Sequence, residues 1–592
     1  MTDPRLYRAA LVPVMFALVL LAFSLENSPR PLTAALAPDA FAGDRAFQRA
    51  YGSGGLADRF PDRRPGSLGD ERLADAVAAQ MHEAGFRVRT TVHDGQTIDG
   101  RRALRTVIAE RTGTVDERIV VVAHRDAAGH RADAELSATA TLLELARVFG
   151  APRQTQRTLT LVSTSGGSGG AAGAARLAGE LRGRIAGVLV LGDLASRNLR
   201  APLLAPWSNR LGSSPPRLRA TLQDALRLET GSGQHQPRAL SQFARFALPA
   251  TYGEQGVLLA GGLPAVALSI GGDRPPRADA PISRERMTAL GRVALRTVTA
   301  LDGAPRGQPV SPHASSSDLV TSRKVLPGWA VRMFVGTLLL APLVVAVDAL
   351  AAVRRARDPL LPWLRWTLAS ALPLVVAALF ALALGAVGLL AATPDAPVAP
   401  AALPAQVAAL LAVALVLVLG WAWLRPAVLR LTGPVGEPSA PAAGVVVVLV
   451  ALAVTIVVWI GNPYAAAMLV PALHVWLFAL APDLPLRRAV RVALVALGIV
   501  PVAVVAVIVA GALGLGGLDA AWELLLLVAG GHVSPLGVLL WSLLAGCAAA
   551  ALTIAARGPV PDAGEELPIT VRGPHSYAGP GSLGGTESAL RR

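Results

Sequence analysis

Seven long apolar runs in the C-terminal half limit what this chain can fold into. They lie near residues 328–353, 367–392, 403–424, 443–461, 464–482, 490–514 and 534–556. An α-helix needs about 20 apolar residues to cross a bilayer, and these runs are close to or above that length. Charged residues make up 16% of the chain, whereas about 25% is usual in soluble proteins. The C-terminal half is therefore predicted to be an all-α polytopic membrane bundle.

Arginines gather in every second connection between these runs, at 354–365, 425–430 and 487–491. The intervening connections carry no Arg or Lys and lie around 393–402, 461–463 and 515–533. Basic residues are retained on the cytoplasmic side of membranes. We therefore attribute the net charge of +15 to membrane topology. The expected contact is the lipid bilayer, and no nucleic-acid partner is expected.

The N-terminus has one further apolar run, Ala9–Phe23, which Arg5 and Arg8 precede. Its length fits either a cleaved signal peptide or a short membrane span. No small-x-small cleavage site follows it directly, which favours an uncleaved signal anchor and eight spans in all. Cys547, the one cysteine, lies in an apolar run and is expected to pack there. A single cysteine excludes an intrachain disulfide or a zinc site built from several cysteines.

The segment between the N-terminal run and the bundle alternates strand and helix patterns. Residues 118–123 and 158–163 read as buried strands, residues 74–86 and 137–149 as helices. Such alternation is typical of an α/β sandwich with a mainly parallel sheet. Residues 519–530 are too short to span and are expected to form an interfacial or re-entrant helix.

The chain divides accordingly into five parts, whose N-terminus and tail are expected in the cytoplasm. They are a signal anchor or first span at 1–26, an extracytoplasmic α/β domain at 27–303, a Pro/Ser/Gly-rich linker at 304–327, a membrane domain of about seven helices at 328–556, and a disordered cytoplasmic tail at 557–592. The first part of the α/β domain, residues 27–60, is a Pro/Ala-rich lead-in.

Two polar motifs end apolar strand patterns in the α/β segment. Ala123-His124-Arg125-Asp126 follows the first strand, and Asp193 closes the run Val188–Leu191. Over about residues 60–300 the segment resembles the bacterial zinc aminopeptidases, a family that includes glutamate carboxypeptidase and the non-catalytic transferrin receptor and nicastrin. The resemblance implies a zinc-aminopeptidase-like α/β sandwich in a bacterial cell membrane. It implies that His124 and Asp193 bind zinc and that Asp126 orients the imidazole.

Most of the other family ligands are replaced. The bridging aspartate falls at Ala134, although Asp133 lies one residue earlier. The paired glutamates, one a general base and one a ligand, fall at Gly167 and Ser168, and the last histidine falls at Gln255. Catalytic zinc normally keeps three protein ligands and an open water position. The sequence therefore leaves either no cofactor or one weak zinc held by His124, Asp133 and Asp193.

Three functions follow from these residues. The favoured one is a membrane-anchored, catalytically inactive peptidase-like protein whose exported domain binds a peptide or protein partner. The second is an extracytoplasmic aminopeptidase with an atypical single-zinc site. The third is a transporter or envelope-assembly protein, in which the intramembrane residues Asp348 and His474 are the polar candidates. A hydrogen bond between helices is the expected role of His474.

Overall fold

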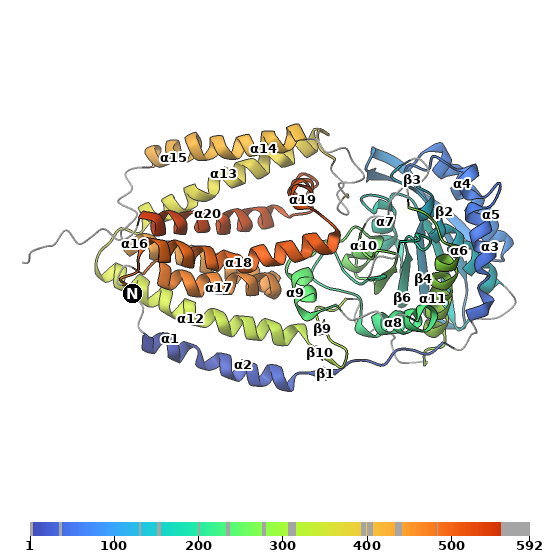
Figure 1. The fold of residues 1–592 in the computed structure, drawn as a ribbon, viewed down its shortest axis with the longest axis horizontal. Helices are drawn as coiled ribbons and strands as arrows, with labels where there is room; N and C mark the ends of the chain where they lie inside the picture. Colours follow the sequence, from blue (N-terminus) through green and yellow to red (C-terminus); the bar gives the residue numbers. More distant parts are fainter. Residues whose placement is uncertain are drawn as a thin grey trace, which may run out of the picture.

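The computed structural model separates a helical bundle from an α/β domain, which lie end to end along the long axis (Figure 1). The residues described are 4–34, 38–129, 132–150, 155–198, 202–231, 237–274, 280–305, 315–391, 398, 407–432, 441–481 and 484–557. The predicted tail at 557–592 lies outside these residues from position 558 onward.

A seven-stranded sheet forms the centre of the α/β domain, in the order β2-β3-β5-β4-β6-β8-β7. Its strands are β2 Arg87–Thr97, β3 Gly100–Arg111, β4 Val115–His124, β5 Arg157–Thr164, β6 Ile185–Leu191, β7 Leu204–Ala205 and β8 Ala265–Leu268. The four central strands β5, β4, β6 and β8 run parallel, whereas β2, β3 and β7 pair antiparallel with their neighbours. The prediction of a mainly parallel sheet was therefore wrong in part, because the sheet is mixed.

The β2–β3 hairpin accounts for most of this difference. Asp99-Gly100 lies at its turn, where Gly100 has a φ of 90° that favours glycine. Asp-Gly between two alternating runs is a strong hairpin signal. This signal was present in the sequence and pointed to antiparallel pairing.

Helices cover both faces of the sheet, and β4 shows why. Ile119, Val121 and Ala123 pack into one apolar core, while Val120 and Val122 pack into the other. Successive side chains of a strand point to opposite faces, so a strand buried on both sides is apolar throughout. The first core is formed with α3 Gly43–Tyr51, α4 Leu56–Arg59, α5 Leu68–Glu83, α6 Leu136–Gly150, α8 Pro216–Thr230 and α11 Arg284–Asp302, the second with α7 Ala172–Glu180 and α10 Glu254–Ala260.

The structure contains the predicted helices and strands of the α/β domain, but with different ends. The expected helix at 74–86 begins earlier, because Ser67 caps α5 by accepting a hydrogen bond from the Asp70 amide. The Pro/Ala-rich lead-in at 27–60 contains two helices, α3 and α4.

The bundle contains the helices of the apolar runs. Their bounds are α1 Pro4–Ala10, α2 Val12–Phe23, α12 Gly328–Arg355, α13 Leu361–Ala386, α14 Val407–Leu419, a π-helical turn at Gly420–Leu424, α15 Arg425–Leu431, α16 Pro441–Gly461, α17 Pro463–Ala479, α18 Arg488–Leu513, α19 Gly517–Ala529 and α20 Pro535–Arg557. Among the described residues, seven helical segments are long and apolar enough to cross a membrane, including Arg5–Phe23. The eighth expected span is α17, which has only 17 residues. It begins at Pro463, one residue before the expected run, where Asn462 caps it, and it ends at Ala479, three residues before the run does.

His474 and Asp348 lie in different helices and do not form one site. His474 of α17 forms a hydrogen bond with the Tyr7 hydroxyl at 2.7 Å and another with the Leu338 carbonyl oxygen at 3.1 Å. It thereby links α1, α12 and α17. Asp348 of α12 is half-buried, and its carboxylate has no hydrogen bond or ion pair within the described part of the chain.

A small sheet and helix α9 join the two parts. β1 Glu26–Asn27, β10 Lys324–Leu326 and β9 Leu319–Val320 pair antiparallel, so part of the predicted linker at 304–327 is ordered sheet, while its residues 306–314 lie outside the described ranges. Helix α9, Ala239–Ala247, packs against α17 and α18. Its residues Ala244, Phe246 and Ala247 share one apolar core with the bundle.

Candidate functional site

A small cavity lies where the parallel strands end. Its volume is about 80 Å³. The lining residues that carry chemistry are His124, Glu135, Ser168, Asp193, Tyr252, Glu254, Gln255, Asp273 and Arg274. His124 ends β4, Ser168 follows β5 and Asp193 follows β6. Ligands of open α/β sheets bind at the carboxyl ends of the strands, so the fold places this cavity where a site is expected.

His124 is surrounded by carboxylates. Its Nδ1 lies 3.8 Å from the Glu254 carboxylate, and Glu135 and Asp126 also act on it. Burial alone would lower the pKa of His124, but these three negative groups outweigh burial and raise it.

Asp126 is hydrogen-bonded to the loop after β5. Its carboxylate accepts hydrogen bonds from the Gly167 amide at 3.0 Å, the Ser168 amide at 2.9 Å and the Ser168 hydroxyl at 2.5 Å. The resemblance implied that Asp126 orients His124, but the oxygens of Asp126 accept hydrogen bonds from the loop after β5 instead. The same loop packs against His124, since a Cβ atom at Gly167 would lie 2.4 Å from the Cβ of His124. A glutamate cannot occupy position 167 unless His124 moves.

Asp193 lines the cavity but is held by its own loop. Its carboxylate accepts from the Ala195 amide at 2.9 Å, the Ser196 amide at 3.0 Å and the Ser196 hydroxyl. Ser137 donates to the Ala134 carbonyl oxygen and accepts from the Leu194 amide at 2.8 Å. These bonds fix the loop after β6 against the start of α6.

Glu135, not Asp133, reaches the cavity. Asp133 and Ala134 belong to a 3₁₀ turn with Glu135, and Asp133 does not line the cavity; its carbonyl oxygen accepts from the Tyr51 hydroxyl at 2.9 Å. The prediction that Asp133 supplies a ligand therefore finds no support in this geometry. Glu135 occupies the position after the replaced bridging residue, so counting along the motif could have found it.

Glu254 was passed over for its neighbour Gln255. Glu254 is buried, accepts from the Thr164 hydroxyl at 2.6 Å and faces His124. Gln255 also lines the cavity, but its amide donates to the Thr251 hydroxyl at 2.9 Å and to Asp273 at 3.1 Å. Both begin α10, and only the course of that helix decides which one faces His124.

The residues do not fit a zinc ion. The carboxylate oxygens of Asp126 and Asp193 already accept hydrogen bonds from backbone amides and serine hydroxyls. Within the described ranges no three His, Cys, Asp or Glu side chains converge closely enough to hold a metal. A structural or catalytic zinc requires at least three such ligands. We derive no chemical step through a metal.

The acidity of the cavity gives a pH-dependent stability. Burial raises the pKa of Glu135 to about 7, so the folded chain binds its proton more tightly than the unfolded chain between about pH 4.5 and 7. The contribution of Glu135 to the free energy of unfolding is therefore most favourable below this window and becomes less favourable as pH rises through it. We expect Glu135→Gln to raise the free energy of unfolding by about 1–3 kcal/mol at about pH 8 and to leave it unchanged near pH 4.5. Thermal melting at both pH values measures this, with exposed Glu83→Gln as control; equal effects at both pH values would contradict it.

Comparison with known proteins found similar solved structures, each of which covers a little under half of this chain. No protein-family model matches the chain. No curated protein matches it either. Among solved structures, the glutaminyl cyclase of Fimbriiglobus ruber is 17% identical and covers 46% of this chain and 99% of its own, with a TM-score of 0.36. That of an Acidobacteriales bacterium is 19% identical over 46% and 99%, with a TM-score of 0.35. A candidate Zn-dependent exopeptidase of Bacteroides vulgatus is 16% identical over 47% and 100%, with a TM-score of 0.30.

Proposed function

We propose that this chain is a multi-pass membrane protein whose peptidase-like α/β domain lies outside the cytoplasm, carries out no hydrolysis and binds a peptide or protein partner. The alternation of arginine-rich and arginine-free connections supports the orientation. The seven apolar helices support membrane insertion.

One observation carries the inactive assignment: the two retained carboxylates are already hydrogen-bonded. Asp126 accepts hydrogen bonds from the Gly167 and Ser168 amides. Asp193 accepts hydrogen bonds from the amides two and three residues after it. A carboxylate that accepts backbone amides would have to give up those bonds to reach a metal, at a cost of about 1–3 kcal/mol for each buried donor left unpaired. Gly167 and Ser168 provide no general base.

The size of the cavity bears on the partner. Its volume is about 80 Å³, whereas small-molecule sites usually enclose about 300–1,000 Å³. A peptide therefore does not enter as a peptidase substrate would, and the contact is expected at the rim, which Ser168 helps to form. The apolar core shared by α9 and the bundle supports a second role, in which the domain braces the membrane helices.

Metal content and hydrolysis test the proposal. We expect the purified full chain to hold zinc well below one equivalent after incubation with the metal. Aminopeptidase turnover should be reduced by roughly 10²–10⁴-fold or more relative to an enzyme with a general base. Cyclisation of glutaminyl peptides is measured in the same samples. One equivalent of zinc, with activity that disappears in His124→Ala, would overturn the proposal and favour a single-metal enzyme built on His124, Glu135 and Glu254.

The partner is tested in intact membranes. A photo-reactive residue at Ser168 should cross-link to a discrete peptide or protein, while the same residue at exposed Leu228 on α8 should not. Equal labelling from both positions would show that Ser168 does not mark a binding surface.

A further inference from the structure

A second hollow lies between the edge strand β2 and helix α7, and it shares no lining residue with the cavity at His124. Its volume is about 630 Å³, within the range of about 300–1,000 Å³ that is usual for ligand sites. It is lined by Arg89, Thr91, Ala175, Arg176, Gly179, Glu180 and Arg182.

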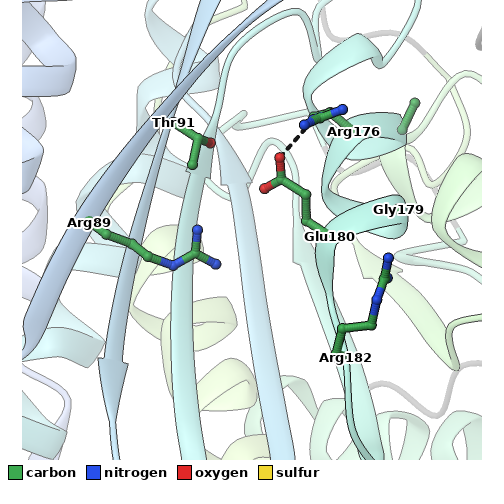
Figure 2. Close-up of a pocket in the computed structure, with 7 residues that line it drawn as sticks. Arg89, Thr91, Arg176, Gly179, Glu180 and Arg182 are labelled. Atoms are coloured by element: carbon green, nitrogen blue, oxygen red, sulfur yellow. Dashed lines mark hydrogen bonds and ion pairs between the residues drawn. The ribbon is translucent and has the colours of Figure 1, made fainter.

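The lining converges from three places in the sequence. Arg89 and Thr91 are two residues apart on β2, so their side chains leave the same face of the strand. Arg176 and Glu180 are one helical turn apart on α7, and Arg182 follows the end of that helix. Figure 2 shows Arg89 reaching in from β2 while Arg182 reaches in from the opposite side.

The charges in this hollow do not cancel. Glu180 pairs with Arg176 through a contact of 2.6 Å, drawn in Figure 2. Arg89 and Arg182 have no ion pair within the described residues, and Arg182 donates only to the neighbouring Leu181 carbonyl oxygen at 3.1 Å. On the adjoining strand β3, by contrast, Arg101 and Arg105 each pair with a carboxylate. The hollow thus contains two arginines that no carboxylate of the described residues neutralises.

A buried hydroxyl lies in the same place. The Oγ1 atom of Thr91 is shielded from solvent and has no hydrogen-bond partner in the described part of the protein. Leaving a buried polar group unpaired costs about 1–3 kcal/mol. A ligand oxygen in the hollow would supply the missing partner.

We propose that this hollow binds a phosphate monoester or inorganic phosphate. Guanidinium groups donate two parallel hydrogen bonds to phosphate oxygens, and Arg89 and Arg182 stand on opposite sides of the space to do so. Two uncompensated positive charges match the double negative charge of a monoester at neutral pH. The volume exceeds that of a bare phosphate group and leaves room for the moiety that the phosphate carries. The same chemistry is present in a soluble phosphomonoester and in the headgroup of phosphatidic acid.

Calorimetric titration of the full chain in phosphatidylcholine nanodiscs tests the site. The probes are inorganic phosphate and, separately, short-chain phosphatidic acid. We expect Arg89→Ala and Arg182→Ala each to weaken binding by roughly tenfold or more, and the double variant to abolish it. Thr91→Val keeps the shape of the side chain and should weaken binding several-fold. Arg101→Ala removes an exposed arginine of β3 outside the hollow and should leave the affinity unchanged.

The two probes distinguish the source of the phosphate. Arginine-dependent binding of inorganic phosphate supports a soluble ligand, and arginine-dependent binding confined to phosphatidic acid supports a lipid headgroup. Absence of binding by both probes would overturn the proposal. So would binding that is equal in the wild type and the double variant, or that Arg101→Ala weakens as much as Arg182→Ala does. Unchanged melting temperatures in these variants exclude misfolding as the cause.

Discussion

Replacing Asp70 by alanine is expected to lower the free energy of unfolding of the α/β domain by about 3–5 kcal/mol, the largest effect foreseen for this domain. Asp70 and Arg125 form an ion pair of 2.7 Å in which neither side chain is exposed. The Asp70 carboxylate also accepts from the Ser165 hydroxyl at 2.6 Å and the Gly66 amide at 3.0 Å. Alanine would leave the Arg125 charge buried without a counter-ion.

Thermal unfolding of the full chain in detergent measures this effect. For a domain of this size the loss corresponds to a fall in Tm of roughly 6–20 °C. Burial raises the pKa of Asp70 to about 6 against the opposing effect of Arg125, so the measurement belongs at about pH 8, where the carboxylate is ionised. Asp62→Ala is the matched control, because Asp62 pairs with Arg64 at the surface, and it should cost less than about 1 kcal/mol. A comparable loss in both variants would show that the buried pair is not what stabilises the domain.

Asp273→Ala is expected to destabilise the junction between the domain and the bundle by about 3–5 kcal/mol. Asp273 forms an ion pair with Arg245 of α9, and both side chains are almost fully buried. It also accepts from the Thr251 hydroxyl at 2.5 Å and from Gln255. Without Asp273, Arg245 would retain a buried charge beside the Trp207 ring.

A double variant separates the charge from the packing. Arg245→Met with Asp273→Ala removes both charges and should recover most of the lost stability, because replacing a buried ion pair with apolar groups is often close to neutral. Hydrogen exchange should quicken in α9 in Asp273→Ala and return toward the wild-type rate in the double variant, while α8 serves as an internal reference. A double variant as unstable as the single one would contradict this account.

Local patterns were sufficient for much of the fold. A continuous apolar run marked β4, because a strand covered on both faces needs no polar side chains, and a short run rich in Thr, Leu and Val marked β5. The apolar runs after residue 327 likewise marked the bundle helices, except that α17 ends at Ala479, three residues before its run does. The mixed character of the sheet was foreseeable from Asp99-Gly100, a turn signal within the sequence.

The sequence by itself determined which ligands of the zinc aminopeptidases, the family it resembles, are replaced, since this depends only on which residues stand at positions 134, 167, 168 and 255. Only the tertiary structure decided what the remaining groups do. The loop after β5, distant in the chain, donates hydrogen bonds to Asp126, whereas Asp193 is held by its own loop. The turn before α6 and the start of α10 bring Glu135 and Glu254 beside His124. Except at Asp193, the direction of each side chain and its hydrogen-bond partners depend on contacts between segments far apart in the chain, and no local pattern specifies them.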